Sequence, residues 1–181
     1  KAEAVRQGML VALARPEPHY AGYWDADLAT PLESILELSA VLDANPKLAM
    51  VFGARVKLLG RHVERQLLRH YLGRVFATTV SVVLRLPVYD TQCGAKAMPR
   101  QAVEAVRPHL RLADLAFDVN LLYSLRRAGV SVKEVPTVWT DQSGSKVAFN
   151  LRTSMNMLLS LVRLRLLYSP FYRWMRPLRP L

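Results

Sequence analysis

Cysteine, long apolar runs and paired histidines are scarce in this chain of 181 residues. The single cysteine, Cys93, cannot form a disulfide within the chain, so nothing in the sequence indicates an oxidising compartment. The longest uncharged apolar stretch, Val75 to Leu84, is too short to span a bilayer. The four histidines have no metal-ligand spacing. These absences exclude a disulfide-stabilised scaffold and a histidine-based metal centre.

The start of the chain, from Lys1 to Arg6, has neither an initiator methionine nor the pattern of a signal peptide. It reads as the middle of a helix, so we expect the true N-terminus to lie upstream. The hydrophobic content of 51% is enough for one domain with a sizeable core. The net charge of +11 indicates an anionic partner: nucleic acid, anionic lipid or a phosphorylated substrate.

Helical and strand patterns alternate along the chain. The predicted helices cover 2–14, 31–44, 62–86, 99–107, 117–128 and 150–168, and the predicted strands cover 20–24, 48–52 and 130–139, with a short strand within 88–98. Thr30 is expected to cap the second helix, whose apolar face is marked by Leu32, Ile35, Leu36, Ser39 and Leu42. The alternation predicts an α/β domain with a mainly parallel sheet.

Asp25 and Asp27 follow the first predicted strand as Asp-x-Asp. In an extended chain such residues point to the same side, where two carboxylates can hold one Mg²⁺ or Mn²⁺ with substrate phosphates as further ligands. The alternative is a solvated acidic turn. The position at the carboxyl end of a strand favours the metal, because ligands bind there in open α/β sheets.

Basic residues follow the next strand. Gly53-Ala54-Arg55 combines a close backbone approach with a bidentate phosphate ligand. Arg61, Arg65 and Arg69 are spaced by four, which places all three on one helical face. We interpret this face as a surface for a phosphorylated acceptor, with a solvated helix face as the alternative. The apolar continuation of that helix is expected to pack inward.

The stretch from Asp90 to Lys96, with the sequence Asp-Thr-Gln-Cys-Gly-Ala-Lys, follows a helix stop and is typical of a ligand-binding loop. The alternative is a turn capped by Asp90. Cys93 is expected to be a buried packing residue. Asp118 begins a helix, and Gly144-Ser145-Lys146 forms a small polar loop that could cover a diphosphate or be a plain exposed turn.

In their order and spacing these motifs resemble family-2 glycosyltransferases of the dolichyl-phosphate glucosyltransferase and dolichyl-phosphate mannose synthase type. The motifs are Asp25-x-Asp27, Gly53-x-Arg55, Asp90-Thr91-Gln92-Cys93-Gly94-x-Lys96, Phe117-Asp118, Pro136-x-x-Trp139 and Gly144-Ser145-Lys146. The Asp-Thr-Gln-Cys-Gly stretch is closer to the glucosyltransferase branch. The resemblance covers about 1–146 and extends loosely through the last helix.

The resemblance implies a GT-A fold, in which a Rossmann-like sheet binds a nucleotide-sugar and Mg²⁺ or Mn²⁺. Asp25 and Asp27 would hold the metal, and Asp90 and Asp27 would act at the transferred sugar, with Asp90 as base or orienting group. The donor diphosphate would contact Asp25, Asp27, Arg55 and Lys146, and the acceptor phosphate would contact Arg65, Arg69 and Lys146. The donor would be UDP-glucose or GDP-mannose, and the acceptor a polyprenyl phosphate.

Two departures from the family stand out. Its N-terminal strand–helix unit, which holds the base and ribose of the donor, has no match here, so about 80 residues would be absent by usual domain sizes. The 181 residues alone are then expected to bind nucleotide-sugar weakly. Asn120 stands where the family usually has an acid.

The chain divides into a catalytic part, 1–149, and a basic helix and tail, 150–181. The second part has six arginines and no acid, which suits an anionic membrane surface, here the cytoplasmic face, although the helix could equally pack on the sheet. Two other functions stay open: a catalytically incomplete transferase that serves as a scaffold, and a nucleic-acid-binding module. The second lacks a recognisable binding motif, so we expect no nucleic acid as partner.

Overall fold

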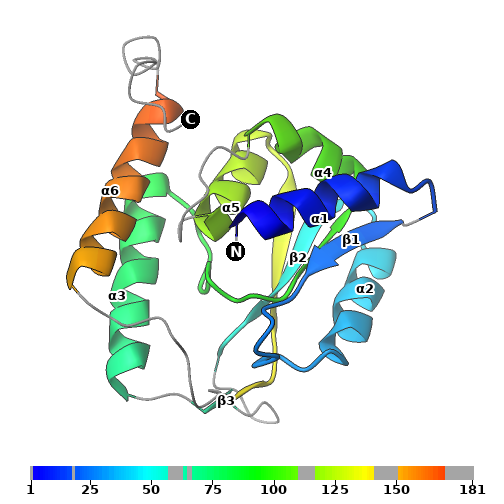
Figure 1. Cartoon of the computed structure of the whole chain (residues 1–181). Helices are drawn as coiled ribbons and strands as arrows, with labels where there is room; N and C mark the ends of the chain where they lie inside the picture. Colours follow the sequence, from blue (N-terminus) through cyan, green and yellow to red (C-terminus); the bar gives the residue numbers. More distant parts are fainter. Residues whose placement is uncertain are drawn as a thin grey trace.

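A computed structural model describes residues 2–17, 19–56, 63–64, 67–109, 117–140 and 151–169 (Figure 1). The helices are α1 (Ala2–Ala14), α2 (Ser34–Ala44), α3 (Leu67–Leu84), α4 (Arg100–Val106), the 3-10 turn η1 (Arg107–His109), α5 (Phe117–Arg127) and α6 (Leu151–Leu167). The strands are β1 (Tyr20–Tyr23), β2 (Leu48–Ala54), β3 (Val63–Glu64), β4 (Lys96–Pro99), β5 (Ser131–Pro136) and β6 (Trp139–Thr140).

The central sheet has the strand order β1-β4-β2-β5 in the described part of the chain. Strands β2 and β5 are parallel, from Leu48 beside Ser131 to Ala54 beside Pro136. Strand β4 lies between β1 and β2 and runs antiparallel to both. Consequently β1, β2 and β5 point the same way, and their carboxyl ends share one edge of the sheet.

This mixed sheet confirms the α/β class and corrects the expectation of mainly parallel pairing. The chain enters β4 from the loop that follows α3, at the same edge where β1 and β2 end. A strand that starts at that edge must run back across the sheet, so its two pairings are antiparallel. The short strands β3 and β6 form a separate parallel pair.

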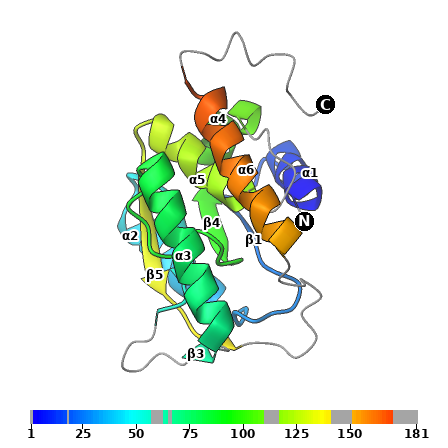
Figure 2. The ribbon, with the colours of Figure 1, turned by 90° about the vertical axis from the view of Figure 1, so that its left-hand side faces the viewer.

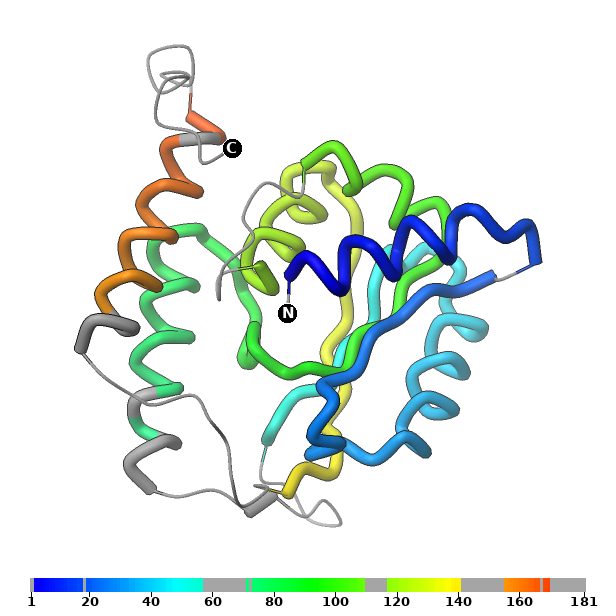
Figure 3. The backbone as a smooth tube through the Cα atoms, in the orientation of Figure 1, coloured from blue at the N-terminus to red at the C-terminus, as the bar shows by residue number. Residues whose placement is uncertain are grey.

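Helices cover both faces of the sheet, as the tube in Figure 3 shows. On one face, α2 packs Leu38 and Leu42 against Val51 of β2. On the other face, α1, α4 and α5 surround the opposite side of β2, including Met50 and Phe52. Alternate residues of β2 therefore serve two different cores, as expected of a central strand buried on both sides.

The apolar face of α2 differs from the expected one. Of the expected face, Leu42 is buried but Leu32, Ile35 and Leu36 are exposed. Leu38, which was not part of the expected face, is buried. Thr30 does not cap the helix, because α2 begins at Ser34 and the Thr30 hydroxyl lies 4.0 Å from the Cys93 sulfur in the core.

The single helix expected over 62–86 is also wrong at its start. Val63 and Glu64 form strand β3, and α3 begins at Leu67. The later part of α3, which was expected to pack inward, is apolar on both sides of the helix. Val80 and Leu84 are buried, while Val75 and Val82 are more than half exposed. Among the described helices, none has both the length and the apolar content needed to cross a membrane.

Candidate active site

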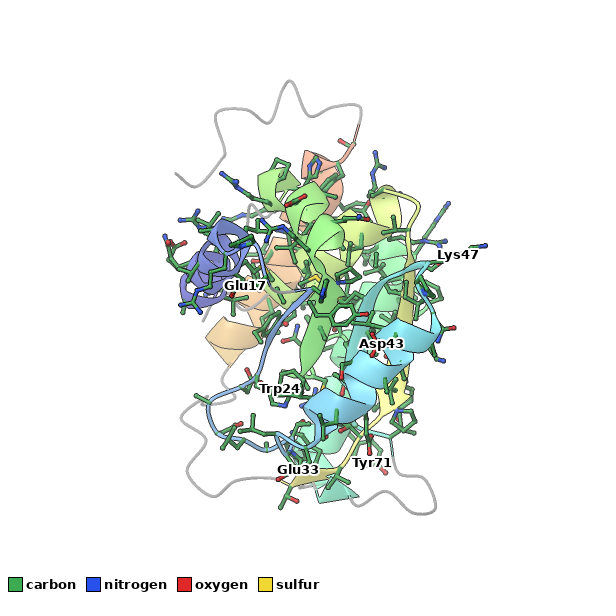
Figure 4. All side chains as sticks on the ribbon, turned by 90° about the vertical axis from the view of Figure 1, so that its right-hand side faces the viewer. Glu17, Trp24, Glu33, Asp43, Lys47 and Tyr71 are labelled. Carbon is green, nitrogen blue, oxygen red and sulfur yellow. The ribbon has the colours of Figure 1, made fainter. Side chains whose placement is uncertain are left out.

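The predicted site residues gather where β1, β2 and β5 end and where the loop 86–95 enters β4. Asp25 follows β1, Arg55 follows β2, Trp139 follows β5, and Asp90 lies on the loop. Carboxyl ends of strands in open α/β sheets are the usual place for ligands. Figure 4 shows Trp24, the neighbour of Asp25, toward the same end of the molecule as Glu33 before α2.

The Asp-x-Asp pair lies in a turn and not in the extended chain that we assumed. The Leu28 amide donates to the Asp25 carbonyl at 3.0 Å, and Leu28 has a left-handed φ of 51°. Within this turn, the Ala29 amide donates to Oδ1 of Asp27 at 3.1 Å. Asp25 is half-buried and Asp27 is exposed, so one carboxylate faces the protein and the other faces solvent.

Gly94 brings the two motifs into contact. A Cβ added at this position would lie 1.9 Å from Oδ2 of Asp25, which is far inside any allowed contact. The Asp25 carboxylate thus rests directly against the backbone of the 90–96 loop, and only glycine permits that approach. Two segments about 70 residues apart in the sequence form one site.

Asp90 and Arg55 form a buried bidentate ion pair. Nε of Arg55 donates to Oδ2 at 2.6 Å and Nη2 donates to Oδ1 at 2.8 Å, while the Arg55 amide also donates to Oδ2. The guanidinium also lies 5.5 Å from the ring centre of Trp139. Burial alone would raise the pKa of Asp90, but the charge and hydrogen bonds of Arg55 outweigh it and hold the pKa well below its ordinary value.

This pairing changes what the two residues can do. An anionic carboxylate with a strongly lowered pKa is a poor proton acceptor at neutral pH. Two of the donor nitrogens that Arg55 could offer a diphosphate are committed to Asp90. The geometry therefore favours Asp90 as a group that orients Arg55 and the loop.

A buried hydrogen-bond network around Lys96, which the sequence analysis did not predict, supports the 90–96 loop. Lys96 is fully buried, and its Nζ donates to Oδ1 of Asp118 at 2.8 Å, to the Thr91 carbonyl at 3.3 Å and to the Cys93 carbonyl. All three donors of the ammonium group are thus used. The hydroxyl of Tyr23 donates to the same Asp118 oxygen at 2.5 Å. Burial, followed by the Asp118 charge, raises the pKa of Tyr23 well above its usual value.

Glu134 and Arg74 fix the N-terminal part of the same loop, at Tyr89 and Asp90. Glu134 of β5 accepts hydrogen bonds from the Tyr89 amide, at 2.8 Å to Oε2, and from the Asp90 amide, at 2.7 Å to Oε1. Arg74 of α3 stacks on the Tyr89 ring at 3.8 Å and donates to the Tyr89 carbonyl. The loop is consequently fixed by one helix and one strand on this side.

Three buried polar atoms near the loop have no hydrogen-bond partner in the described structure. They are Nε1 of Trp24, Oγ1 of Thr91 and Nε2 of Gln92. Buried polar groups are nearly always paired, so these three atoms are available to a ligand or to water at the candidate site. A divalent cation fits the site only with help from a substrate, since no cluster of three or more acidic, histidine or cysteine ligands occurs in the described ranges. Mg²⁺ is commonly held by one or two carboxylates and substrate phosphates, so Asp25 and Asp27 suit it.

The other predicted residues have mixed outcomes. Cys93 is buried, as expected, and burial raises the pKa of its thiol. Asn120 is fully buried in α5. Arg69 lies in α3, but its side chain is outside what the structure describes. Arg61, Arg65 and Lys146 lie outside the described residues, so their roles stay predictions.

An α/β domain with an acidic turn and a clamped loop at the carboxyl ends of its strands is consistent with a GT-A-like glycosyltransferase. No family model matches the chain. A dolichyl-phosphate beta-glucosyltransferase from Dictyostelium discoideum is 30% identical over 172 residues, which is 93% of this chain and 51% of that protein. The enzyme of the same name from Saccharomyces cerevisiae is 29% identical over 179 residues, or 93% and 52%. The one from Mus musculus is 33% identical over 149 residues, or 79% and 46%.

The resemblance to family-2 glycosyltransferases is therefore confirmed. The chain is a homologue of dolichyl-phosphate beta-glucosyltransferases over most of its own length. It spans about half the length of the curated relatives it matches.

Proposed function

We propose that this chain forms most of the catalytic half of an inverting glycosyltransferase that moves glucose from a nucleotide-sugar to a polyprenyl phosphate of the dolichyl type. The observation that carries the proposal is the contact of Asp25 with Gly94, which joins the Asp-x-Asp turn to the loop before β4. Homology to dolichyl-phosphate beta-glucosyltransferases over 93% of the chain supports glucose and a dolichyl acceptor. UDP-glucose is the donor we expect, with GDP-mannose as the alternative.

The reaction needs little proton transfer. An oxygen of the acceptor phosphate forms a bond to the anomeric carbon, and the bond from that carbon to the diphosphate oxygen breaks with inversion. The electron pair leaves with the nucleoside diphosphate. A phosphate monoester is already largely ionised at pH 7, so no strong base is required. The lowered pKa of Asp90 suits this chemistry, because a permanently anionic Asp90 can hold Arg55 throughout the reaction.

Asp25 and Asp27 would hold Mg²⁺ or Mn²⁺ together with the donor diphosphate. The cation, when bound, supplies positive charge that stabilises the departing diphosphate. Oδ1 of Asp27 already accepts the Ala29 amide, which fixes the direction of the carboxylate. Asp25 is held against Gly94. Both side chains are thus positioned before a ligand arrives.

The basic residues and the acceptor fit an enzyme that works at an anionic membrane surface. A polyprenyl phosphate has its charged group in the headgroup layer and its chain in the bilayer. The stretch 150–181, with six arginines and no acid, would approach such a surface readily. We propose a peripheral position at the cytoplasmic face.

Transfer of labelled glucose tests this function. The protein, expressed with the coding sequence that flanks these residues, is incubated with labelled UDP-glucose or GDP-mannose, Mn²⁺ and a short polyprenyl phosphate. We expect label in the organic phase from UDP-glucose, and loss of that label in Asp25→Asn but not in the exposed control Glu33→Gln. Donor binding without transfer would instead support the scaffold alternative, and no response to either donor would refute the proposal.

A further inference from the structure

Glu134 places a carboxylate beside the loop that carries Asp90. Strand β5 pairs in parallel with β2, and Glu134 lies beside Phe52. Val132 packs against the core on the α5 side of the sheet. Side chains two residues apart in a strand point to the same face, so Glu134 points to that face as well. Figure 1 shows the chain after α3 lying between this helix and the sheet, and Figure 2, turned by 90°, shows α3 in front of the sheet. The loop therefore passes directly by Glu134.

The carboxylate of Glu134 binds two successive main-chain amides. The Tyr89 amide donates to Oε1 at 2.9 Å and to Oε2 at 2.8 Å, and the Asp90 amide donates to Oε1 at 2.7 Å. Adjacent amides that point to one anion form a concave main-chain site, and hydrogen bonds to a charged acceptor are stronger than neutral ones. Glu134 forms no ion pair with a Lys or Arg of the described ranges, so its charge is directed at the loop.

The second of these amides belongs to Asp90, whose side chain reaches the neighbouring strand. Oδ2 of Asp90 accepts the amide of Arg55 at 3.1 Å and its Nε at 2.6 Å, while Oδ1 accepts Nη2 at 2.8 Å. Asp90 is consequently held at its main chain by β5 and at its side chain by the residue that follows β2. Loss of the first contact would leave the ion pair in place but let it shift relative to the sheet.

Other residues keep the loop attached when Glu134 is removed. Lys96 holds the later part of the loop through two carbonyls, and Arg74 stacks on the Tyr89 ring. The hydrogen bonds from Tyr89 to Glu134 are exposed to solvent, and exposed charged contacts contribute little to folding. Removal of Glu134 should therefore change the position of Asp90 more than the stability of the fold.

We infer that Glu134 is a positioning residue for glucose transfer, which acts through the main chain of Asp90 on Arg55. This inference rests on the proposed function and extends it to a residue outside the Asp-x-Asp turn and the 90–96 loop. Arg55 is proposed to contact the donor diphosphate, where negative charge increases as the nucleoside diphosphate leaves. A guanidinium displaced by about 1 Å would stabilise that charge less, and displacements of this size lower rates by about 100-fold.

Steady-state kinetics of two variants separate positioning from a need for charge. Oε1 of Glu134 accepts both amides, so Glu134→Gln keeps an acceptor at the right distance, whereas Glu134→Leu has a similar volume and no acceptor. The protein is expressed with its flanking coding sequence and assayed with labelled UDP-glucose, Mn²⁺ and a short polyprenyl phosphate. We expect kcat to fall about 10–100-fold in Glu134→Leu, but less than about threefold in Glu134→Gln, which loses only the charge of the acceptor.

The donor KM should change less than kcat in Glu134→Leu, because the displaced group acts on charge that develops in the transition state. Equal losses of kcat in the two variants would show that the charge of Glu134 is required, and would overturn the inference.

Urea unfolding distinguishes positioning from a purely structural role. The midpoint of Glu134→Leu should lie within about 0.5 M of the wild type, and Glu17→Leu, at an exposed position after α1, should match the wild type in both midpoint and kcat. If the activity of Glu134→Leu falls only in proportion to an unfolded fraction, Glu134 is a structural residue and the inference is wrong.

A combination of Glu134→Leu with Asp90→Asn tests the route through Asp90. The second substitution weakens the ion pair with Arg55 through which Glu134 would act. In that background the loss of kcat caused by Glu134→Leu should shrink to less than about threefold, because residues in one chain of contacts do not act additively. The same loss in both backgrounds would contradict the inference.

The wild-type protein separates this inference from the proposed function. If it transfers sugar from neither UDP-glucose nor GDP-mannose, the proposed function is refuted and the inference falls with it. If it transfers glucose and Glu134→Leu does so at the same rate, only the inference is refuted.

Discussion

Replacing Lys96 with methionine should destabilise the fold far more than its single charge suggests. Methionine matches the length of the lysine stem, so packing is largely kept, but the Asp118 carboxylate loses its cation while it stays 2% exposed. Removing one partner of a buried ion pair costs about 3–5 kcal/mol because the other charge is left uncompensated. The free energy of unfolding of a typical domain is about 5–15 kcal/mol, so the change is large.

Urea unfolding followed by tryptophan fluorescence measures this effect. With a slope of about 2 kcal/mol per molar urea, the midpoint should fall by roughly 1.5–2.5 M. The control is Arg6→Met, which removes one partner of the exposed pair between Arg6 and Glu3 and should leave the midpoint unchanged. A further variant, Lys96→Met with Asp118→Asn, removes both charges.

The double variant should be less destabilised than the sum of the two single changes, by at least about 1 kcal/mol, because the residues interact directly. The Tyr23 hydroxyl can still donate to the asparagine oxygen. A midpoint of Lys96→Met within about 0.3 M of the wild type, or strict additivity in the double variant, would show that the network beneath the loop contributes little.

Three further changes test other parts of the site. The stability that Asp90 contributes should be complete above its ordinary pKa of about 3.9 and be lost as the pH falls through its lowered folded pKa. In a pH series of urea midpoints, Asp90→Asn should therefore flatten this acid-induced loss. A series unchanged by the substitution would contradict the pairing of Asp90 with Arg55. Gly94→Ala should displace Asp25 and lower kcat/KM for the donor at least tenfold with unchanged circular dichroism, and wild-type kinetics would disprove the contact. Arg69→Lys should raise the apparent acceptor constant, measured at saturating donor, because the free energy of acceptor binding weakens by about 1.5–3 kcal/mol. A solvated helix face predicts a change in that free energy within about 0.5 kcal/mol.

Local patterns predicted most of the elements but not their pairing. The helices at 2–14 and 117–127 lie where helices were predicted, at 2–14 and 117–128, and Gly129, with a φ of 72°, follows the second of them. The strand 96–99 was expected within a loop, but its antiparallel insertion between β1 and β2 depends on where the chain enters the sheet. The inner face of α2 was misjudged because both sides of that helix carry leucines.

The candidate site was predicted as motifs and not as contacts. Asp25, Arg55 and Asp90 were each chosen from their position after a strand or a helix stop. Their actual partners lie far along the chain: Arg55 and Asp90 are separated by 35 residues, and Glu134 reaches back 45 residues to Tyr89. Sequence spacing identifies only residues that are neighbours within one turn or one strand. A charged residue at an inward position of a strand, as Lys96 is in β4, was the available signal for a buried pair.

The central claim is that the Asp25-x-Asp27 turn binds the donor diphosphate with a divalent cation. The most direct measurement is the rate of glucose transfer from labelled UDP-glucose to a short polyprenyl phosphate by Asp27→Ala, beside Glu33→Ala as the exposed control, with Mn²⁺ and with EDTA. We predict a loss of at least about 100-fold for Asp27→Ala, in line with the removal of one charge-stabilising group, wild-type rates for the control, and no transfer in EDTA. Full activity of Asp27→Ala in EDTA would contradict the account.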